Sequence, residues 1–280
     1  MNCISCDDKV EKFTDNSYLN LPTFRCNTCG LFVTGDLEQK IIENTIKIYN
    51  EKHWGKENLW DAETAIKSDY IDIDSQGKKR TWISQYKYCE HYLKNKQNIL
   101  EIGSGQGQTS WWFEEKGFKV TGIEPDENNV NLINKKLQHG KCIVGSAEDF
   151  EINETFDIIW MSHVLEHIIK PELFLNKIKK NMKENGIFFI EVPNCENKST
   201  LETSINLVPH TFHFSQKSLM NIVKKAGFEI IKTDFFRPAT KFEGMIQKIN
   251  KKFPYYPRIL TNNKDGIFLR ILIRIPSLEN

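Results

Sequence analysis

The spacing of apolar residues changes part-way along the chain. Between residues 37 and 97, apolar positions recur at the spacing of an amphipathic helix. From residue 98 onward, short apolar runs typical of buried strands alternate with helical segments. The predicted strands cover residues 98–102, 119–124, 141–144, 156–161, 186–193, 229–235 and 266–275, and the predicted helices cover 111–116, 128–139, 172–182 and 215–225. This alternation favours an α/β fold in which helices cover both faces of a parallel sheet.

The chain divides into three predicted parts. Residues 1–36 form a small cysteine-rich segment, residues 37–97 a mainly helical cap or linker, and residues 98–280 the α/β domain. The first part is too short to bury a core of its own, so a metal would supply much of its stability. Ser215 is the predicted N-cap of the last helix, because a serine hydroxyl accepts a hydrogen bond from a free amide of the first turn.

Composition and charge narrow the class of protein. The chain has 280 residues, of which 39% are hydrophobic and 27% charged, as in a folded globular protein. Its 38 basic and 37 acidic residues give a net charge of +1, whereas nucleic-acid-binding proteins usually carry a basic surplus. No apolar run approaches the ~20 residues of a membrane span, and residues 1–8 lack the pattern of a secretory signal. We therefore expect a cytoplasmic protein without a membrane span, and the overall charge does not favour a nucleic-acid partner, although a local basic patch would be compatible with it.

Four of the seven cysteines are regularly spaced. Cys3 and Cys6 form one C-x2-C pair, and Cys26 and Cys29 form a second pair after nineteen intervening residues. Two such pairs are typical of a tetrahedral zinc site. Four thiolates would leave no open position for water, so we predict a structural zinc ribbon. The alternatives are four unrelated thiols or disulfides, although disulfides are rare in the cytosol.

A glycine-rich loop follows the first predicted strand of the α/β domain. Gly103, Gly105 and Gly107 alternate with polar residues, and such glycines let a ligand approach the backbone. Gln108 stands where a dinucleotide-binding loop needs a further glycine, and no Lys-Ser/Thr pair follows, so the loop is neither of that type nor a P-loop. Glu101 on the preceding strand is placed to face a cationic group rather than a pyrophosphate.

Acidic residues follow the next two predicted strands. Glu124 ends the second strand, where a carboxylate can bind both hydroxyls of a ribose, and Pro125 is placed to pack on a base. Glu148 follows the third strand and could meet an exocyclic amine. Ligands bind at this end of open α/β sheets. Each acid alone would more simply be a solvated loop residue, so the prediction depends on their combination.

Together these segments resemble the class I S-adenosylmethionine-dependent methyltransferases. Residues 98–125 resemble motifs I and II of that family, residues 146–150 its adenine-binding turn, residues 156–167 its motif IV, and residues 212–229 the tail of many small-molecule and glycan members. The resemblance implies a Rossmann-like seven-stranded sheet whose last strand is antiparallel. The N-terminal ribbon resembles the zinc element of some sugar C-methyltransferases.

The same resemblance implies a cofactor site for S-adenosylmethionine. Glu101 and the glycines would hold its methionyl part, Glu124 its ribose, and Glu148 would lie beside its adenine. The cofactor-binding residues that we predict are Glu101, Gly103, Ser104, Gly105, Gly107, Glu124, Pro125, Ala147, Glu148 and Met161.

Histidines are the candidates for catalysis. Methyl transfer needs its reactants in line, and transfer to a hydroxyl also needs a base. His213 is the first choice for that base because apolar rings flank it, and His163 is the second because it follows the fourth predicted strand. The full set of catalytic candidates is His213, His163, His210 and His167.

Two other interpretations of these histidines stay open. His163, Glu166 and His167 are spaced i, i+3, i+4, so they would share one face of a helix. With one later histidine they could bind a divalent metal, in an arrangement similar to that of small-RNA 2′-O-methyltransferases. Alternatively, Glu166 and His167 only anchor the loop after the strand.

We therefore expect a methyltransferase that modifies an oxygen of a small polar acceptor, such as a sugar nucleotide or a surface-glycan precursor. Three alternatives remain: an inactive methyltransferase-fold binding module, an RNA methyltransferase that docks through its zinc ribbon, and an NAD-dependent dehydrogenase. The intact Glu101, Gly103 and Glu124 argue against an inactive module, and Gln108 argues against a dehydrogenase.

Overall fold

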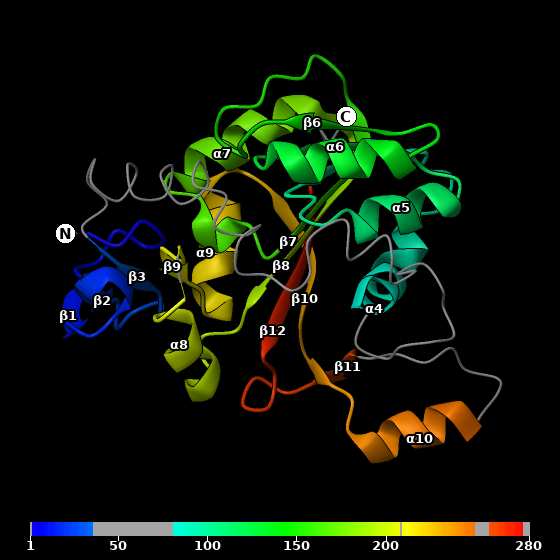
Figure 1. The fold of residues 1–280 in the computed structure, drawn as a ribbon. Coiled ribbons are helices and arrows are strands. Elements are labelled where there is room, and N and C mark those ends of the chain that lie inside the picture. Colours follow the sequence, from blue (N-terminus) through cyan, green and yellow to red (C-terminus); the bar gives the residue numbers. More distant parts are fainter. Residues whose placement is uncertain (1, 36–80, 208, 250–257, 277–280) are drawn as a thin grey trace.

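The computed structural model describes residues 2–35, 81–207, 209–249 and 258–276 (Figure 1). Of the predicted helical segment 37–97, residues 37–80 lie outside these ranges. Residues 81–92 form helix α4 (Thr81–Cys89) and a 3₁₀ turn (Glu90–Tyr92). Within the described ranges, no helix has the length and apolar character needed to span a membrane.

A mixed sheet forms the centre of the described structure. Its strand order is β11-β10-β12-β8-β7-β4-β5-β6. The strands from β6 to β8 in this order are parallel, and β12 is antiparallel to both of its neighbours, β8 and β10, as predicted for the last strand. The bounds are β4 (Asn98–Ile102), β5 (Lys119–Glu124), β6 (Lys141–Val144), β7 (Phe156–Ser162), β8 (Met182–Pro193), β10 (Glu229–Pro238), β11 (Arg258–Thr261) and β12 (Phe268–Arg274).

The prediction of seven strands is wrong by one. The additional strand, β11, pairs antiparallel with β10 at the edge of the sheet, where Phe235 lies opposite Thr261. It is short, none of its four residues is buried, and its sequence, Arg-Ile-Leu-Thr, has neither the alternation nor the longer apolar run that predicts a strand.

Helices cover both faces of this sheet. The four predicted helices are present, although α7 ends before the predicted position and leads into β8 through a 3₁₀ turn (Lys179–Asn181). Ser215 caps α9 as predicted, since its hydroxyl accepts a hydrogen bond from the amide of Ser218. Two short helices, α8 and α10, were not predicted. The bounds are α5 (Gln108–Glu115), α6 (Glu127–Lys136), α7 (Pro171–Ile178), α8 (Lys198–Ser204), α9 (Gln216–Lys225) and α10 (Lys241–Ile249).

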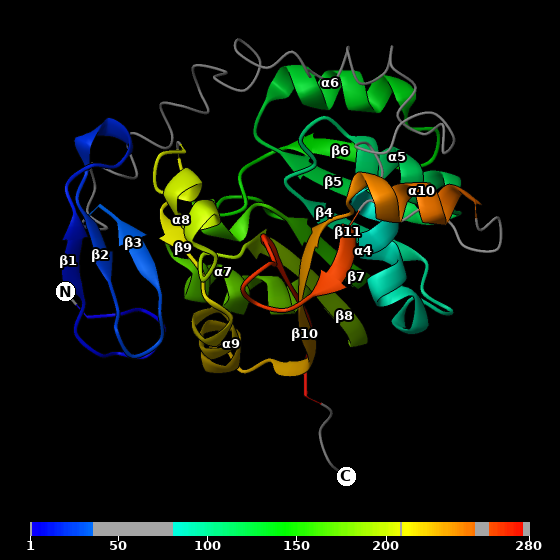
Figure 2. The ribbon, with the colours of Figure 1, turned by 90° about the horizontal axis from the view of Figure 1, so that it is seen from below.

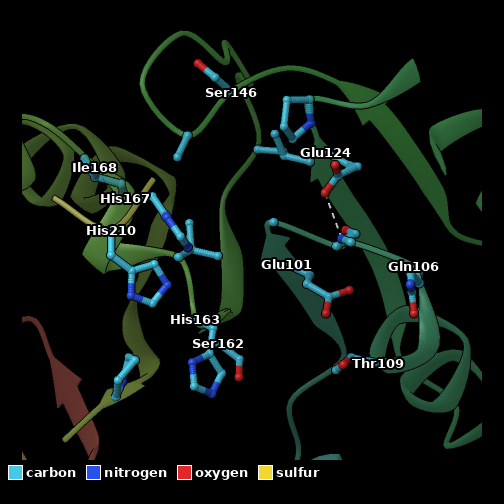
Figure 3. A pocket seen from close by; sticks show the side chains of 18 of the residues that line it. Glu101, Gln106, Thr109, Glu124, Ser146, Ser162, His163, His167, Ile168 and His210 are labelled. Carbon is cyan, nitrogen blue, oxygen red and sulfur yellow. Dashed lines mark hydrogen bonds between the residues drawn. The ribbon is translucent and has the colours of Figure 1, made fainter. Parts of the chain in front are cut away.

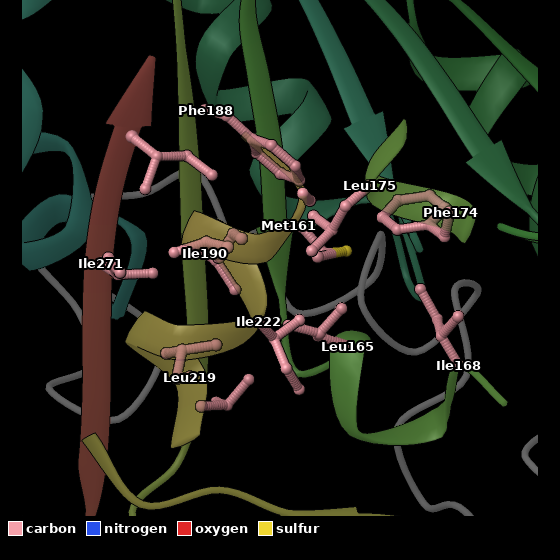
Figure 4. Packing of buried hydrophobic residues seen from close by; sticks show 14 of the residues in the cluster. Met161, Leu165, Ile168, Phe174, Leu175, Phe188, Ile190, Leu219, Ile222 and Ile271 are labelled. Carbon is pink, nitrogen blue, oxygen red and sulfur yellow. The ribbon is translucent and has the colours of Figure 1, made fainter. Parts of the chain in front are cut away.

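The central strands are buried on both faces. Met161 and Ile190 face α7 and α9 and belong to the cluster in Figure 4. Trp160 and Phe189, one residue away along each strand, belong to the cluster on the other face with α4, α5 and α6, and their rings stack with centroids 4.1 Å apart. This alternation is the period of two that a strand imposes on its side chains.

The cysteine-rich segment forms a second, antiparallel sheet. β1 (Glu11–Thr14), β2 (Thr23–Arg25) and β3 (Phe32–Thr34) lie in the order β1-β2-β3-β9. The fourth strand, β9 (Phe212–His213), comes from the segment between α8 and α9. Figure 2 shows β1, β2 and β3 next to β9 and α8, at one side of the central sheet. We call residues 2–35 the ribbon below.

Candidate functional site

A cavity of about 1090 Å³ lies at the carboxyl ends of the parallel strands β4, β5 and β7. Figure 3 shows its two sides. The glycine loop, Glu101 and Glu124 lie on one side, and His163, His167 and His210 lie on the other. The cavity therefore brings together most of the predicted cofactor-binding residues and three of the four catalytic histidine candidates, which lie in different parts of the sequence.

The glycine loop borders the cavity with its backbone. The amide of Gly103 donates to the carbonyl of Ile123 (2.8 Å), which ties the loop to β5. A Cβ on Gly103 would lie 2.4 Å from Cγ2 of Val164, so a larger residue would require Val164 to move and would also be strained by the φ of +72°. Gly107 has φ of +80° and precedes α5, but it does not line the cavity. The structure therefore does not support a cofactor contact for Gly107, whose positive φ turns the chain into α5.

Two buried carboxylates lie beside this loop. Glu124 accepts hydrogen bonds from the amides of Gly105 (Oε2, 2.7 Å) and Asp126 (Oε1, 3.1 Å). Glu101 accepts a short hydrogen bond from the hydroxyl of Ser110. Burial raises the pKa of both Glu101 and Glu124 to about 7, because desolvation disfavours the charged form. A cation or a set of hydroxyls in the cavity would stabilise their ionised forms.

The remaining predicted cofactor residues separate into two groups. Met161 is fully buried in the core of Figure 4 and does not line the cavity, so the structure does not support the predicted contact between Met161 and the cofactor. Its side chain points to the opposite face from a cavity residue because strands alternate. Glu148 lines the cavity and accepts a hydrogen bond from the amide of Ile169 (Oε1, 2.8 Å). Those that line the cavity are Glu101, Gly103, Ser104, Gly105, Glu124, Pro125, Ala147 and Glu148.

His163 is held between two carboxylates. Its backbone is left-handed, with φ of +57°, which is uncommon for a residue with a side chain. Nδ1 lies 3.4 Å from Oε1 of Glu166, and Nε2 lies 3.2 Å from Oε1 of Glu191. Burial works against the imidazolium, but the interactions with Glu166 and Glu191 outweigh it, and the pKa of His163 is raised to about 9. A histidine that keeps its proton at neutral pH does not fit the expected role of a base.

Glu191, which contacts His163, is a buried carboxylate that the sequence analysis did not single out. It is fully buried in β8, and its Oε2 accepts from Nε of Arg270 (2.5 Å). Its Oε1 accepts from Arg258 and from Nε2 of Gln85 (2.9 Å). The signal was a single carboxylate within the otherwise apolar run of residues 186–193, which predicts a charged partner because buried charges are paired.

Glu166, His167 and His210 form a compact group. One ligand atom from each lies within 4.8 Å of the other two. Glu166 is fully buried, and neither of its oxygens accepts a hydrogen bond from a described residue; its contact with His163 is an ion pair. Glu166 and His167 belong to a 3₁₀ helix (Leu165–His167) rather than to the α-helix that the i, i+3, i+4 spacing assumed. Burial lowers the pKa of His210 to about 4 and also lowers the pKa of His167, so both are neutral imidazoles at pH 7.

His213 does not have the geometry of a base. It is fully buried in β9, it does not line the cavity, and both ring nitrogens are in hydrogen bonds. Nε2 lies 2.8 Å from the hydroxyl of Thr34, and Nδ1 lies 2.8 Å from the hydroxyl of Ser204. The apolar flanks that made it a candidate are core contacts. We therefore correct the first choice of base: His213 is structural, and His210 takes its place at the cavity.

Helix α8 lines the end of the cavity next to these histidines. Ser199, Thr200 and Thr203 contribute hydroxyl groups to this wall. Leu207 and Phe268 line the same end with apolar surface. A mixture of hydroxyls and one aromatic ring suits a polar ligand that has a ring of its own.

The four ribbon cysteines converge on one point. The Sγ atoms of Cys3 and Cys29 lie 3.5 Å apart, as do those of Cys6 and Cys26, and all four lie within 4.8 Å of one another. All seven cysteines are free thiols, which excludes the disulfide alternative in this structure. A hydrogen bond from Cys3 lowers the pKa of Cys29 to about 5. Thiolates around zinc lie ~2.3 Å from the metal, hence ~3.8 Å from one another, so this group has the dimensions of a zinc site.

Comparisons with known proteins identify the family of the chain. A family model described as a methyltransferase domain matches residues 74–233. The ubiquinone biosynthesis O-methyltransferase of Rhizobium etli is 28% identical over 121 residues, which are 39% of this chain and 49% of that protein. Pavine N-methyltransferase of Thalictrum flavum subsp. glaucum is 31% identical over 112 residues, which are 37% of this chain and 32% of that protein. The aligned part thus spans half or less of these curated relatives.

A solved structure shows the same fold. A crystal structure of a SAM-dependent methyltransferase from Archaeoglobus fulgidus matches with a TM-score of 0.55 and 19% sequence identity. The match covers 72% of this chain and 95% of that one. At this identity the likeness concerns the fold alone.

Proposed function

The chain belongs to a family of methyltransferase domains, and from this premise we propose that it uses S-adenosylmethionine to methylate a hydroxyl group of a small polar acceptor such as a sugar nucleotide or a surface-glycan precursor. One observation carries the proposal. The same cavity has buried carboxylates, Glu101 and Glu124, at one end and a neutral histidine, His210, with the hydroxyls of α8 at the other.

The carboxylate end suits the cofactor. S-adenosylmethionine supplies an electrophilic methyl group on a positively charged sulfur. Glu101 is placed for the amino group of its methionyl part, and Glu124 for the hydroxyls of its ribose. The backbone amides of Gly105 and Asp126, which donate hydrogen bonds to the Glu124 carboxylate, fix its orientation before a ligand binds. The positive charge of the cofactor would also favour the ionised forms of Glu101 and Glu124.

The histidine end suits the acceptor. As the acceptor oxygen bonds to the methyl carbon and the carbon–sulfur bond breaks, the hydroxyl proton must leave. We assign that proton to Nε2 of His210, because Nδ1 already contacts the hydroxyl of Ser204 (2.8 Å). General-base catalysis of this kind contributes ~10²–10⁴-fold. His163 would act as a fixed cation that holds the buried carboxylates Glu166 and Glu191 in place.

A metal-assisted form of the same reaction is the second candidate. The observation that favours it is the buried carboxylate of Glu166, which accepts no hydrogen bond from the described residues. Glu166, His167 and His210 would hold a divalent cation, which would lower the pKa of the acceptor hydroxyl. His163 is not in this ligand set, because its nitrogens face Glu166 and Glu191.

The test is a transfer assay with methyl-labelled S-adenosylmethionine and a panel of nucleotide sugars, simple amines and RNA. We expect label in a sugar nucleotide, with mass spectrometry placing the methyl on oxygen. The His210→Ala variant should lose ~10²-fold or more of turnover while it binds the cofactor as the wild type does. Label in amines or RNA alone would overturn the proposed acceptor class.

A chelator separates the two forms of the mechanism. The general-base form predicts that EDTA leaves turnover unchanged over a short exposure that does not remove the ribbon metal. The metal-assisted form predicts that EDTA abolishes turnover and that Mg²⁺ or Mn²⁺ restores it, with no effect of either on the His210→Ala variant.

We propose further that the ribbon holds one structural zinc ion through Cys3, Cys6, Cys26 and Cys29. The sulfur separations given above support this ligand set, and four thiolates would saturate the metal. On this proposal the zinc ion stabilises the ribbon and does not contact the reacting groups.

A further inference from the structure

A chain of buried side chains links the ribbon to the cavity. The hydroxyl of Thr23 lies 3.0 Å from that of Thr34, which lies 2.8 Å from Nε2 of His213. On its other side, Nδ1 of His213 lies 2.8 Å from the hydroxyl of Ser204, which lies 2.8 Å from Nδ1 of His210. Of these five residues, Ser204 and His210 line the cavity. The chain thus begins in β2 and β3 and ends at the proposed acceptor site.

The backbone around this chain is fixed by independent contacts. β3 pairs with β9, so Phe32 lies opposite His213. The amide of Thr34 donates to the carbonyl of Thr211 (2.9 Å), and the amide of Tyr18 donates to the carbonyl of Ile205 (3.1 Å). These contacts set the position of the Thr34 hydroxyl relative to the His213 ring.

The hydrogen bonds can run in two directions. In the first, Nδ1–H of His210 donates to Ser204, Ser204 donates to Nδ1 of His213, and Nε2–H of His213 donates to Thr34. This order leaves Nε2 of His210 without a proton. In the second, every bond is reversed: Thr34 donates to Nε2 of His213, and the proton of His210 lies on Nε2. Neutral imidazoles allow either order, because each then has one donor and one acceptor nitrogen.

Only the first order suits the proposed function. Nε2 of His210 must have a free electron pair whether it removes a proton or binds a metal. The groups around His210 include Glu166, His167, His213 and His163, and the carboxylate of Glu166 favours a proton on a nearby nitrogen. The first order therefore requires an acceptor for the Nε2–H of His213, and the hydroxyl of Thr34 lies in that position.

We propose that Thr34, in the ribbon, is a positioning residue that keeps Nε2 of His210 unprotonated by accepting the hydrogen bond from His213. This inference rests on the proposed role of His210. It gives the ribbon a defined part in the reaction without contact between the ribbon and the substrate. Outer groups that orient a histidine in this way typically contribute 10–100-fold to activity or metal affinity.

A matched pair of variants tests the inference. Thr34→Val keeps the shape of the side chain and removes the hydroxyl, so Nε2–H of His213 loses its acceptor inside the protein. A buried donor without a partner is disfavoured, and the chain should adopt the second order. Thr34→Ser restores the hydroxyl. Thr211→Val is the control, since Thr211 is equally buried beside β9 and its hydroxyl is outside the chain of bonds.

The primary measurement needs no acceptor. Nitrogen-15 NMR of the histidine rings, on the full chain with S-adenosylhomocysteine, distinguishes the two neutral forms of His210. We expect an unprotonated Nε2 in the wild type, in Thr34→Ser and in Thr211→Val, and a protonated Nε2 in Thr34→Val. A protonated Nε2 in the wild type, or the same form in Thr34→Val as in the wild type, would overturn the inference.

Kinetics with the sugar nucleotide that the acceptor panel selects give the second measurement. Thr34→Val should lower kcat ~10–100-fold with little change in KM, and Thr34→Ser should recover most of that loss. If Thr34 had a purely structural role, Thr34→Val would instead raise KM, and the loss of activity would follow the loss of thermal stability. If the panel finds no acceptor, the proposed function fails, and the NMR result still decides whether Thr34 controls His210.

Discussion

Nε2 of His163 lies 3.2 Å from Oε1 of Glu191, a carboxylate that is fully buried and also bonded to two arginines. A buried carboxylate with three cationic neighbours keeps its charge, and the pKa of Glu191 lies well below its usual range although burial alone would raise it. The negative charge in turn helps to keep the proton on His163. This pair therefore links the acceptor end of the cavity to the stability of the fold.

We expect the stability of the protein to fall as the pH rises through the pKa of His163. This pKa is raised to about 9 in the folded state, against an ordinary value of 6.5 for a histidine, so the folded state holds a proton that the unfolded chain has lost between these values. The contribution of His163 is complete below pH ~6.5 and disappears as the pH rises through ~9. The side chain is 36% exposed, so solvent screening reduces the size of the effect.

Urea unfolding of the wild type and of His163→Gln at pH 6, 7.5 and 9.5 measures this contribution. The difference in free energy of unfolding between the two proteins should shrink with rising pH. A difference that stays constant over this range would contradict the assignment of a protonated His163.

The ribose contact of Glu124 is open to a direct test. Glu124→Ala removes both the proposed hydroxyl acceptor and the group that holds the amides of Gly105 and Asp126. We expect cofactor binding to weaken by roughly 1–3 kcal/mol, as for the loss of a hydrogen-bond partner in a buried site. Calorimetry with S-adenosylhomocysteine measures the change, and Glu127→Ala, an exposed position on α6, serves as the control. Equal affinity in both variants would remove Glu124 from the site.

Cofactor affinity should rise with pH up to about 7.5 and then level off. The pKa values of Glu101 and Glu124 are raised to about 7 by burial, so both are partly protonated in the free enzyme at neutral pH. A cationic ligand needs the ionised forms, and each carboxylate that must ionise weakens binding by up to ~10-fold per pH unit below its pKa.

Titration calorimetry in buffers with different ionisation enthalpies would detect the protons released on binding near pH 6.5. The Glu124→Ala variant should release fewer protons than the wild type. Binding that does not vary between pH 5.5 and 8 would show that neither carboxylate is linked to the cofactor.

Metal analysis of the purified protein should find about one zinc per chain. Cys26→Ser should lose this metal and destabilise residues 2–35, because a ribbon of this size depends on its metal. Cys195→Ala, at a buried cysteine outside the group of four, should keep it. A wild type that is fully folded without metal would contradict the zinc site.

The central fold could be predicted because its signals are local. The strands β4, β5, β6, β7 and β8 are apolar runs bounded by polar turns, and Ser215 lies at a helix start that only neighbouring residues define. The helices α5, α6 and α7, each between two consecutive strands, account for the parallel arrangement of β4 with β5, of β5 with β6 and of β7 with β8. β9 and β11 could not be predicted in this way. Each has at most four residues, and its pairing depends on a partner elsewhere in the chain.

Site residues could be predicted where they lie close in sequence to the loop that forms the cavity wall. Glu101 and Glu124 end strands beside the glycine loop, so local position was enough to place them in the cavity. His213 was misassigned because its partner Thr34 is 179 residues away, and nothing in Phe212–Phe214 reveals that contact. Met161 was misassigned for a different reason, since it lies one residue from Ser162, which does line the cavity, and a shift of one position changes the face of a strand.

The pairing of β3 with β9 has a consequence for synthesis of the chain. Thr34 leaves the ribosome 179 residues before His213, an interval of roughly 10–35 s at ~5–20 residues per second. During that time the outer edge of β3 has no neighbouring strand, and an open strand edge is a template for aggregation. Early metal capture by the four cysteines would hold the nascent ribbon compact through this interval, so we expect the yield of soluble protein to depend on zinc supply during translation more than on zinc added afterwards.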